Sequence, residues 1–277
     1  MNKTGKRLLT FFIGMPIVLA IVFFDYMNHL ALQIIIGIFA IIAGNEFYNM
    51  LSKKMPLFSK KVVLILTASL PYICYLFILS EMSLELTPWF FICECLLLMG
   101  LECFHAKTFE NSIAKISGSC LIVFYCGFLI TFLSRLTTLP NSRYIISLFL
   151  VIVFICDSLA WLFGILFGKG TRGYIAASPN KSIVGFIGGI LSSITAAILF
   201  KVLFPNIITT SYGNLAIIGF FTSLAAIVGD LIESVFKRSC NIKDSGNIIP
   251  GRGGVLDSID SILIAAPIFY ICYHFLF

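Results

Sequence analysis

Charged residues are scarce in this sequence. Of its 277 residues, 12% are Asp, Glu, Lys or Arg, whereas 59% are hydrophobic. A soluble domain carries about 25% charged residues, so this composition excludes an ordinary globular enzyme. Histidine is also rare: His29, His105 and His274 are the complete set. Each stands at the end of an apolar run, which favours an interfacial residue over a metal ligand.

Two familiar motifs are missing as well. No second cysteine pair follows Cys93 and Cys95 at the spacing of a zinc site. We therefore interpret most of the nine cysteines as small apolar core residues. The basic N-terminus leads into an apolar run that reaches about Phe24, but bulky residues follow instead of a small-residue cleavage site. This run is interpreted as a retained first span rather than a signal peptide.

Long apolar runs fill most of the chain, and most of them approach the ~20 residues that a helix needs to cross a bilayer. After the run to Phe24 they are Leu30–Gly44, Val62–Ser80, Pro88–Phe104, Gly118–Leu133, Tyr144–Gly168, Ile183–Leu203, Gly213–Glu233 and Val255–Phe277. The sequence therefore predicts an all-α polytopic integral membrane protein with about nine transmembrane helices. Glu94 and Glu102 predict that the fourth helix turns these acids toward protein or a polar cavity rather than lipid.

The distribution of cations predicts the orientation. With nine spans, sixteen of the nineteen Lys and Arg residues fall on the side of the N-terminus. By the positive-inside rule, the N-terminus is cytoplasmic and the C-terminus lies outside. The segment Asp230–Ser261 is then also cytoplasmic. Glu46, at the cytoplasmic end of the second run, could face a site on that side, but the preferred interpretation is a helix-end acid.

The most informative stretch is Asp230–Ser261, which interrupts two apolar runs. It holds five acids and four cations: Asp230, Glu233, Asp244, Asp257, Asp260, Lys237, Arg238, Lys243 and Arg252. Two acid pairs with a spacing of three residues flank a glycine-rich basic loop, and each pair would share one face of a helix. Such pairs could hold a divalent metal ion and a polyphosphate. The alternative is a set of solvated loop ends, although acids inside apolar runs are functional by default.

A second polar constellation lies at residues 157–189. Asp157 stands inside an apolar run, and Gly164 and Gly168 would allow neighbouring helices to approach closely. The segment Ser178–Ser182 precedes a predicted helix and offers backbone donors, hydroxyls and a cation, which suits a phosphate group. The alternative is a capping turn followed by glycines for helix packing.

Both constellations resemble the phosphatidate cytidylyltransferases, or CDP-diacylglycerol synthases. In the C-terminal pattern of that family the matching residues are Ser234, Lys237, Arg238, Lys243, Asp244, Pro250, Gly251, Gly253, Gly254, Asp257 and Asp260. In its upstream elements they are Asp157, Ser158, Ala160, Trp161, Phe167, Gly168, Lys169, Ser178, Pro179, Lys181, Ser182, Gly185, Gly188 and Gly189. Arg252 stands where the family usually has histidine, and Ser258 where it usually has arginine.

The resemblance implies that CTP and phosphatidate are converted to CDP-diacylglycerol and pyrophosphate in phospholipid biosynthesis. Catalytic roles are expected for Asp230, Asp257, Asp260, Asp244, Lys237 and Lys243. Substrate-binding roles are expected for Arg238, Ser234, Ser178, Lys181, Lys169, Arg252, Gly253 and Gly254. Mg2+ is the expected cofactor, on Asp230, Asp257, Asp260 and Asp157, with a second metal ion left open.

The expected partners are CTP, phosphatidate and the lipid bilayer, without nucleic acid, and a homodimer is left open. The expected location is a bacterial-type inner (plasma) membrane with the active site facing the cytoplasm. Residues 1–143 are predicted to be a transmembrane scaffold and residues 144–277 the catalytic half. Two other functions stay open: a CTP-dependent polyprenol- or phytol-type lipid kinase, and a secondary transporter, whose ion pathway would use similar intramembrane acids.

Overall fold

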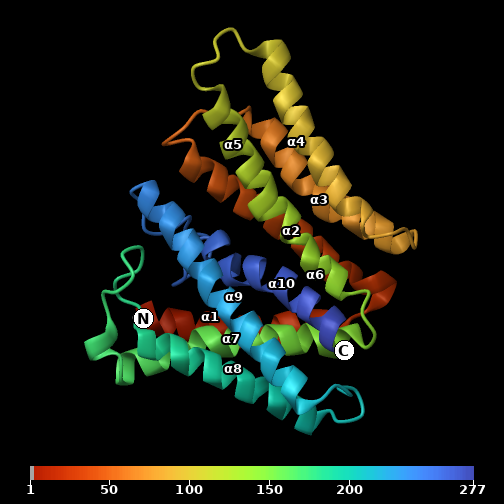
Figure 1. Cartoon of the computed structure of the whole chain (residues 1–277), viewed down its shortest axis with the longest axis vertical. Helices are drawn as coiled ribbons and strands as arrows, with labels where there is room; N and C mark the ends of the chain where they lie inside the picture. The colour runs from red at the N-terminus through yellow and green to blue at the C-terminus, as the bar shows by residue number, and fades with distance from the viewer. Residues whose placement is uncertain (1–2) are drawn as a thin grey trace. The chain divides into compact units, whose positions relative to one another are not determined.

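The computed structural model describes the backbone of residues 3–277 and the side chains of residues 13–277. Within that range the protein is helical and contains no β-strand (Figure 1). In chain order the elements are α1 (Lys3–Phe23), α2 (Tyr26–Leu51), α3 (Lys60–Leu79), α4 (Leu86–His105), α5 (Ser112–Ile122), the π-helix η1 (Val123–Phe128), α6 (Thr131–Leu136), α7 (Ser142–Leu166), the 3-10 helix η2 (Lys169–Thr171), α8 (Ile183–Leu203), α9 (Tyr212–Ser239) and α10 (Leu256–Leu276).

Eight helical segments in the described range are long and apolar enough to cross a membrane. They are α2, α3, α4, the continuous segment Ser112–Leu136, α7, α8, α9 and α10. The first expected span corresponds to α1, whose described side chains form the shorter apolar stretch Ile13–Phe23. The prediction of an all-α polytopic membrane protein is confirmed.

Helix α2 is longer than its apolar run, because it contains 26 residues and ends at Leu51. It continues through Asn45, Glu46 and Asn49, since glutamate propagates a helix almost as well as leucine does. Glu46 is 5% exposed. The interpretation of Glu46 as a helix-end acid is therefore wrong, and its burial requires hydrogen-bond donors from elsewhere.

The chain divides into two compact units. The first unit comprises the residues up to Thr138 together with Ser239–Ser258, and the second comprises Leu139–Arg238 and Ile259–Phe277. Because compactness does not report function, the division into a scaffold and a catalytic half at residues 143 and 144 stays a prediction.

In the first unit, α3 packs against α2 and η1. A Cβ atom at Gly127 of η1 would lie 2.8 Å from the carbonyl oxygen of Thr67 in α3, so this approach requires glycine. The rings of Phe47 from α2 and Tyr125 from η1 pack at a centroid distance of 5.5 Å. Both side chains are almost completely buried and form the core of this unit.

Helix α4 buries two acids on one face. Glu94 accepts a hydrogen bond of 2.6 Å from Ser69 Oγ of α3. Glu102 accepts from Ser112 Oγ at 2.7 Å and forms an ion pair of 2.6 Å with Lys115 Nζ. Both side chains are below 10% exposure. This confirms the prediction that these acids face protein rather than lipid.

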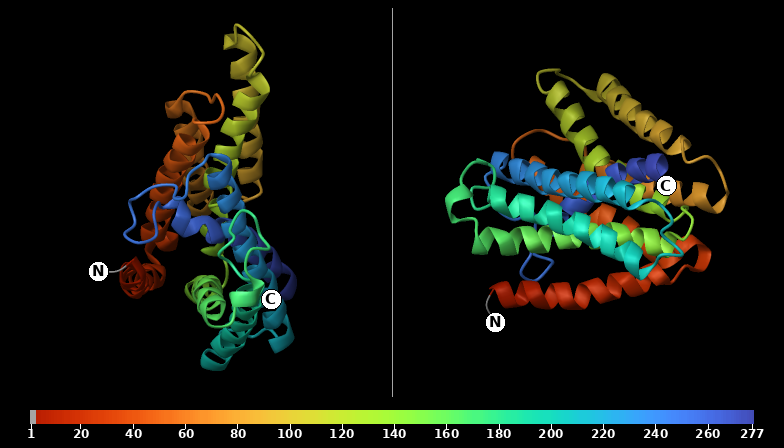
Figure 2. Two further views of the ribbon diagram at one scale, coloured as in Figure 1. Left: turned by 90° about the vertical axis from the view of Figure 1, so that its left-hand side faces the viewer. Right: turned by 60° about the horizontal axis from the view of Figure 1, so that its bottom comes forward.

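In the second unit, α7 and α8 run side by side (Figure 2). A Cβ atom at Gly185 of α8 would lie 2.6 Å from the carbonyl oxygen of Ala160 in α7. At Gly164 a Cβ atom would lie 3.1 Å from Ser182 Oγ, which confirms the role predicted for that glycine. Close packing also joins α9 to α10, because a Cβ atom at Gly229 would lie 2.6 Å from the carbonyl oxygen of Asp260.

Candidate active site

Asp230 and Lys181 form an ion pair in the second unit. Asp230 belongs to α9, and Lys181 belongs to the connection between α7 and α8, which we call the α7–α8 loop (residues 167–182). The lysine is placed by the start of α8, where Ser182 Oγ accepts a hydrogen bond of 3.0 Å from Gly185 N. Both charged side chains keep partial contact with solvent, at 24% and 34% exposure for Lys181 and Asp230. A ligand can therefore reach this pair.

A second ion pair lies one helical turn further along α9. Glu233 is completely buried and pairs with Lys237, four residues later. The spacing places both side chains on the same face of the helix. Removing one partner of such a buried pair leaves an uncompensated charge, which typically costs about 3–5 kcal/mol. Lys237 therefore stabilises the end of α9 in addition to any role toward a ligand.

Asp260 of α10 is the third acid of this neighbourhood. It is 6% exposed, and its Oδ1 accepts a hydrogen bond of 2.6 Å from Ser261 N. Asp260 interacts electrostatically with Asp230, Glu233 and Asp157. We call these four carboxylates, with Lys181 and Lys237, the acid cluster. When all six groups are ionised, the acid cluster has two negative charges in excess, which equals the charge of one divalent cation.

The acid cluster is compatible with a divalent metal only if a ligand supplies further oxygens. Among the described residues, no group of three or more His, Cys, Asp or Glu side chains is close enough to hold a metal ion by itself. Mg2+ is usually bound through one or two carboxylates together with water and substrate phosphates. Asp230 and Asp260 fit this second arrangement, because the two groups interact electrostatically and a divalent cation would relieve the repulsion between them when both are ionised.

The α7–α8 loop is held in place by its own turns. Gly173 N donates to Pro179 O at 3.0 Å, and Lys181 N donates to Ser178 O at 3.1 Å. Gly173 has a φ of +87°, a conformation that favours glycine. Arg238 at the end of α9 donates from Nε to Ala177 O at 3.3 Å. One predicted substrate-binding residue therefore also fastens the loop that carries three others, Lys169, Ser178 and Lys181.

The connection between α9 and α10 is a loop of the first unit, which we call the α9–α10 loop (residues 240–255). Ile249 N donates to Gly253 O at 2.7 Å, and Gly253 N donates back to Ile249 O at 3.0 Å. This tight turn requires positive φ angles of 83° at Gly251 and 117° at Gly253. The predicted glycine motif is therefore a turn whose backbone conformation depends on glycine.

Asp257, in the first turn of α10, organises this loop. Its Oδ2 accepts hydrogen bonds from Ser245 N at 2.8 Å, Ser245 Oγ at 2.9 Å and Gly254 N at 2.7 Å. The bond to Gly254 N reaches back three residues, as in a capping box. Lys243 and Asp244 on the same loop are exposed, and Arg252 is half-buried.

Glu46 also binds this segment. Its two carboxylate oxygens accept from Val255 N at 3.1 Å and from Leu256 N at 2.8 Å. Ser245 Oγ lies 3.2 Å from Glu46 Oε2. The site residues predicted from sequence do not include Glu46. The one local signal for a role of Glu46 is its position directly after an apolar run, in a segment that continues as a helix.

The predicted site residues thus fall into two groups. The acid cluster of the second unit brings together Asp157, Lys181, Asp230, Lys237 and Asp260, with Glu233 as an additional member. The first unit brings Asp257 to Ser245 and Gly254. Ser234 is buried at 8% exposure, and Lys169 is exposed in η2.

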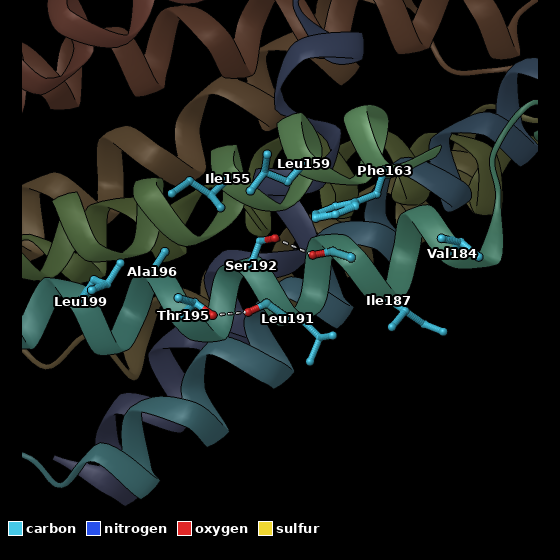
Figure 3. Close-up of a pocket in the computed structure, with 11 residues that line it drawn as sticks. Ile155, Leu159, Phe163, Val184, Ile187, Leu191, Ser192, Thr195, Ala196 and Leu199 are labelled. Carbon is cyan, nitrogen blue, oxygen red and sulfur yellow. Dashed lines mark hydrogen bonds between the residues drawn. The ribbon is translucent and has the colours of Figure 1, made fainter. Parts of the chain in front are cut away.

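An apolar groove with a volume of about 530 Å3 runs along α7 and α8 (Figure 3). Leu159 and Phe163 line it from α7, and the α8 residues that line it extend from Val184 to Leu199. At 1.5 Å per residue, that stretch of helix is about 22 Å long. The hydroxyl of Ser192 donates to Gly188 O at 2.6 Å, and that of Thr195 donates to Leu191 O at 2.9 Å. Each hydroxyl proton is therefore used inside α8.

A family model described as the cytidylyltransferase family matches residues 5–276. Among curated relatives, a phosphatidate cytidylyltransferase of Staphylococcus epidermidis is 39% identical over 132 residues, which are 48% of this chain and 49% of that protein. A second, from Haemophilus influenzae, is 39% identical over 163 residues, covering 57% of this chain and 55% of that protein.

A third relative with the same name, from Rickettsia felis, is 37% identical over 188 residues. This match covers 66% of the chain and 81% of the relative. With the first two relatives, the chain spans about half of their length. The family match, in contrast, extends over nearly the whole chain and includes both units.

Proposed function

The chain belongs to the cytidylyltransferase family, and on this premise we propose that it transfers CMP from CTP to phosphatidate, giving CDP-diacylglycerol and pyrophosphate. The observation that carries the proposal is the acid cluster, in which Asp230 and the Glu233–Lys237 pair lie on a helix otherwise apolar enough to span a membrane. Ionisable groups in such helices are costly and mark functional sites. The names of three relatives support the same substrates.

In the proposed reaction, an oxygen of the phosphatidate phosphate attacks the α-phosphorus of CTP. The bond between that phosphorus and the oxygen bridging to the β-phosphorus breaks, and pyrophosphate leaves with the bonding electron pair. The attacking oxygen is already ionised at neutral pH, so no general base is required. Catalysis then depends on positioning and on neutralising the charge of the phosphates.

Asp230 and Asp260 are the proposed ligands of Mg2+, with Asp157 nearby, because these acids interact electrostatically and a divalent cation would relieve their mutual repulsion. When bound, Mg2+ would neutralise charge that develops on the phosphate oxygens. Lys181 and Lys237 would orient the same oxygens with their ammonium groups. Because Lys181 is only partly buried against Asp230, it can shift toward a phosphate without leaving the cluster.

The α9–α10 loop is the proposed binding element for the polyphosphate of CTP. It carries Lys243, Asp244, Arg252, Gly253 and Gly254. Its two cations suit an anionic ligand, while the N–H groups of Gly253 and Gly254 hold the loop in shape. Arg252 occupies the position where histidine is usual. Its guanidinium stays charged at all physiological pH values, so it would act by charge and hydrogen bonding rather than by proton transfer.

The groove along α7 and α8 is the proposed place for an acyl chain of phosphatidate. An acyl chain crosses one leaflet, about 15 Å or half of the hydrocarbon core, which is shorter than the groove. Val184 at one end of the groove follows Lys181 and Ser182 by two to three residues. A chain in the groove would therefore bring its phosphate toward the cation of the α7–α8 loop.

The protein is an integral membrane protein by its apolar helices. We propose that the N-terminus, the α7–α8 loop and the α9–α10 loop face the cytoplasm of a bacterial inner (plasma) membrane. In the nine-span topology predicted from sequence, sixteen of the nineteen cations fall on that side. CTP is cytoplasmic, so this orientation would give the site access to its nucleotide. A homodimer remains a prediction.

The test is incubation of the purified protein in detergent with Mg2+, phosphatidate and CTP that is labelled either in cytidine or in the terminal phosphate. The proposal requires cytidine label in the extracted lipid and release of pyrophosphate. Terminal-phosphate label in the lipid would instead indicate a lipid kinase. Uptake of a solute into vesicles without chemical conversion would favour a transporter.

A further inference from the structure

We propose that Glu46 is a positioning residue that fixes the α9–α10 loop for the polyphosphate of CTP, an inference that rests on the function proposed above. Glu46 belongs to α2, some two hundred residues before the loop in the chain. It is 5% exposed. A buried carboxylate is costly unless donors surround it. Among the described residues, its hydrogen-bond donors all come from the α9–α10 loop and the start of α10.

Two of these donors are the N–H groups at the beginning of α10. Val255 N and Leu256 N lie 3.1 and 2.8 Å from the carboxylate oxygens of Glu46. The first N–H groups of a helix have no partner within the helix, and the helix dipole makes this end positive. Glu46 therefore supplies the acceptors that α10 lacks and fixes where α10 begins.

The loop backbone also packs against the carboxylate. A Cβ atom at Gly246 would lie 2.9 Å from Glu46 Cδ, and one at Gly254 would lie 2.7 Å from the same atom. No larger residue fits at either position without displacing Glu46. Two of the loop's glycines therefore serve this contact, whereas Gly251 and Gly253 serve the turn.

The two carboxylates that bind the loop, Asp257 and Glu46, connect it to different parts of the structure. Asp257 joins Ser245 to Gly254 and so orders the segment from within. Glu46 connects the same segment to α2. Ser245 Oγ lies within 3.2 Å of both carboxylates, but its one proton can serve only one of them at a time. Asp257 thus sets the shape of the loop, and Glu46 sets its place on α2.

This placement matters for binding because Lys243, Arg252, Gly253 and Gly254 are all carried by the tethered loop. A loop fixed before the ligand arrives does not lose conformational entropy on binding, so affinity improves. Loosening the loop should therefore weaken the binding of CTP while leaving phosphatidate binding unchanged. This separation distinguishes positioning from a general loss of structure.

The test is Glu46→Gln in the full-length protein. Whichever way the amide is turned, its NH2 group faces Val255 N or Leu256 N, donor against donor. Leaving one buried N–H group without an acceptor changes an equilibrium constant by about tenfold or more. We therefore expect the KM for CTP to rise by about tenfold. Trypsin cleavage after Lys243 or Arg252 should accelerate by a similar factor, and this readout requires no activity. The KM for phosphatidate should stay at its wild-type value.

Glu94→Gln is the matched control, because it also neutralises a buried acid of the first unit. Glu94 Oε1 accepts from Ser69 Oγ, and a glutamine can retain that bond. The KM of Glu94→Gln for CTP and the cleavage rate of its α9–α10 loop should match the wild type.

If Glu46→Gln is not recovered from membranes, Glu46→Asp allows the same comparison, because aspartate keeps the charge but is one methylene too short.

Wild-type KM and cleavage in Glu46→Gln would overturn the inference. Faster cleavage at Lys53 and Lys54, between α2 and α3, to the same extent as in the α9–α10 loop would also overturn it, because the effect would then be general. If the wild type transfers no cytidine to lipid, the proposed function fails. The cleavage comparison would still decide whether Glu46 holds the loop.

Discussion

Two pairs of carboxylates, one pair in each unit, have different kinds of partner. In the first unit, Glu46 and Asp257 accept hydrogen bonds from backbone N–H groups, which are fixed by the fold. In the second unit, Asp230 and Glu233 are paired with the ammonium groups of Lys181 and Lys237. A backbone donor cannot leave, whereas a lysine on a flexible stem can turn toward a phosphate. Backbone donors therefore suit carboxylates that fix a loop in place, and lysine partners suit carboxylates that take part in binding and catalysis.

Asp260→Asn should have the largest effect. We expect the turnover number to fall by about 10³-fold, the order seen when one preorganised electrostatic group is removed from an active site. Stability should not fall, because the substitution removes a negative charge from a cluster with an excess of them. The measurements are turnover against Mg2+ concentration and thermal unfolding in detergent. Near-normal turnover at limiting Mg2+ would return Asp260 to a structural role.

Asp257→Asn should affect both activity and stability, which separates it from Asp260→Asn. Its Oδ2 accepts from three donors, and a neutral amide oxygen in its place would make each of these hydrogen bonds weaker than a charged carboxylate does. We expect turnover to fall by about 10²-fold and stability by about 1–3 kcal/mol. Turnover and the midpoint of thermal unfolding are measured side by side. If Asp257→Asn leaves the midpoint of thermal unfolding unchanged, Asp257 does not stabilise the fold more than Asp260 does.

Arg252→Ala should have a smaller effect, limited to substrate binding. The loss of one charged hydrogen-bond donor to a phosphate should raise the KM for CTP by about tenfold. Arg252→His should keep most of the wild-type activity, since histidine is the usual residue of the family at this position. Kinetics at varied CTP concentration test both variants. If Arg252→Ala has wild-type KM, the residue is not part of the nucleotide site.

The smallest expected effect is in the apolar groove. Ser192→Phe should fill part of the groove and raise the KM for long-chain phosphatidate by about fivefold, roughly 1 kcal/mol. Short-chain phosphatidate should be affected less. Leu203→Phe, on the exposed end of the same helix, is the control. An equal effect on both chain lengths would argue that the acyl chain lies elsewhere.

The spans could be predicted from sequence because a bilayer imposes length and hydropathy on every helix. The pairing of Lys181 with Asp230 could not, because the two residues are 49 positions apart and no local pattern connects them. The role of Glu46 was missed for the same reason, since its partners lie about 210 residues later. The contact between Asp257 and Gly254 could be expected from sequence, because the capping box has the same three-residue spacing. The sequence did not indicate which acids would form ion pairs with lysines.

The hydroxyls of Ser192 and Thr195 have a consequence for redesign of the groove. Their donors are satisfied within α8, so what they present to the groove is largely carbon. Exchanging Ser192 for Ala, or Thr195 for Val, should therefore leave the chemical character of the surface nearly unchanged. Sequence variation between small hydroxyl and small aliphatic residues at these positions would be silent, and only a change in volume would alter which lipids fit.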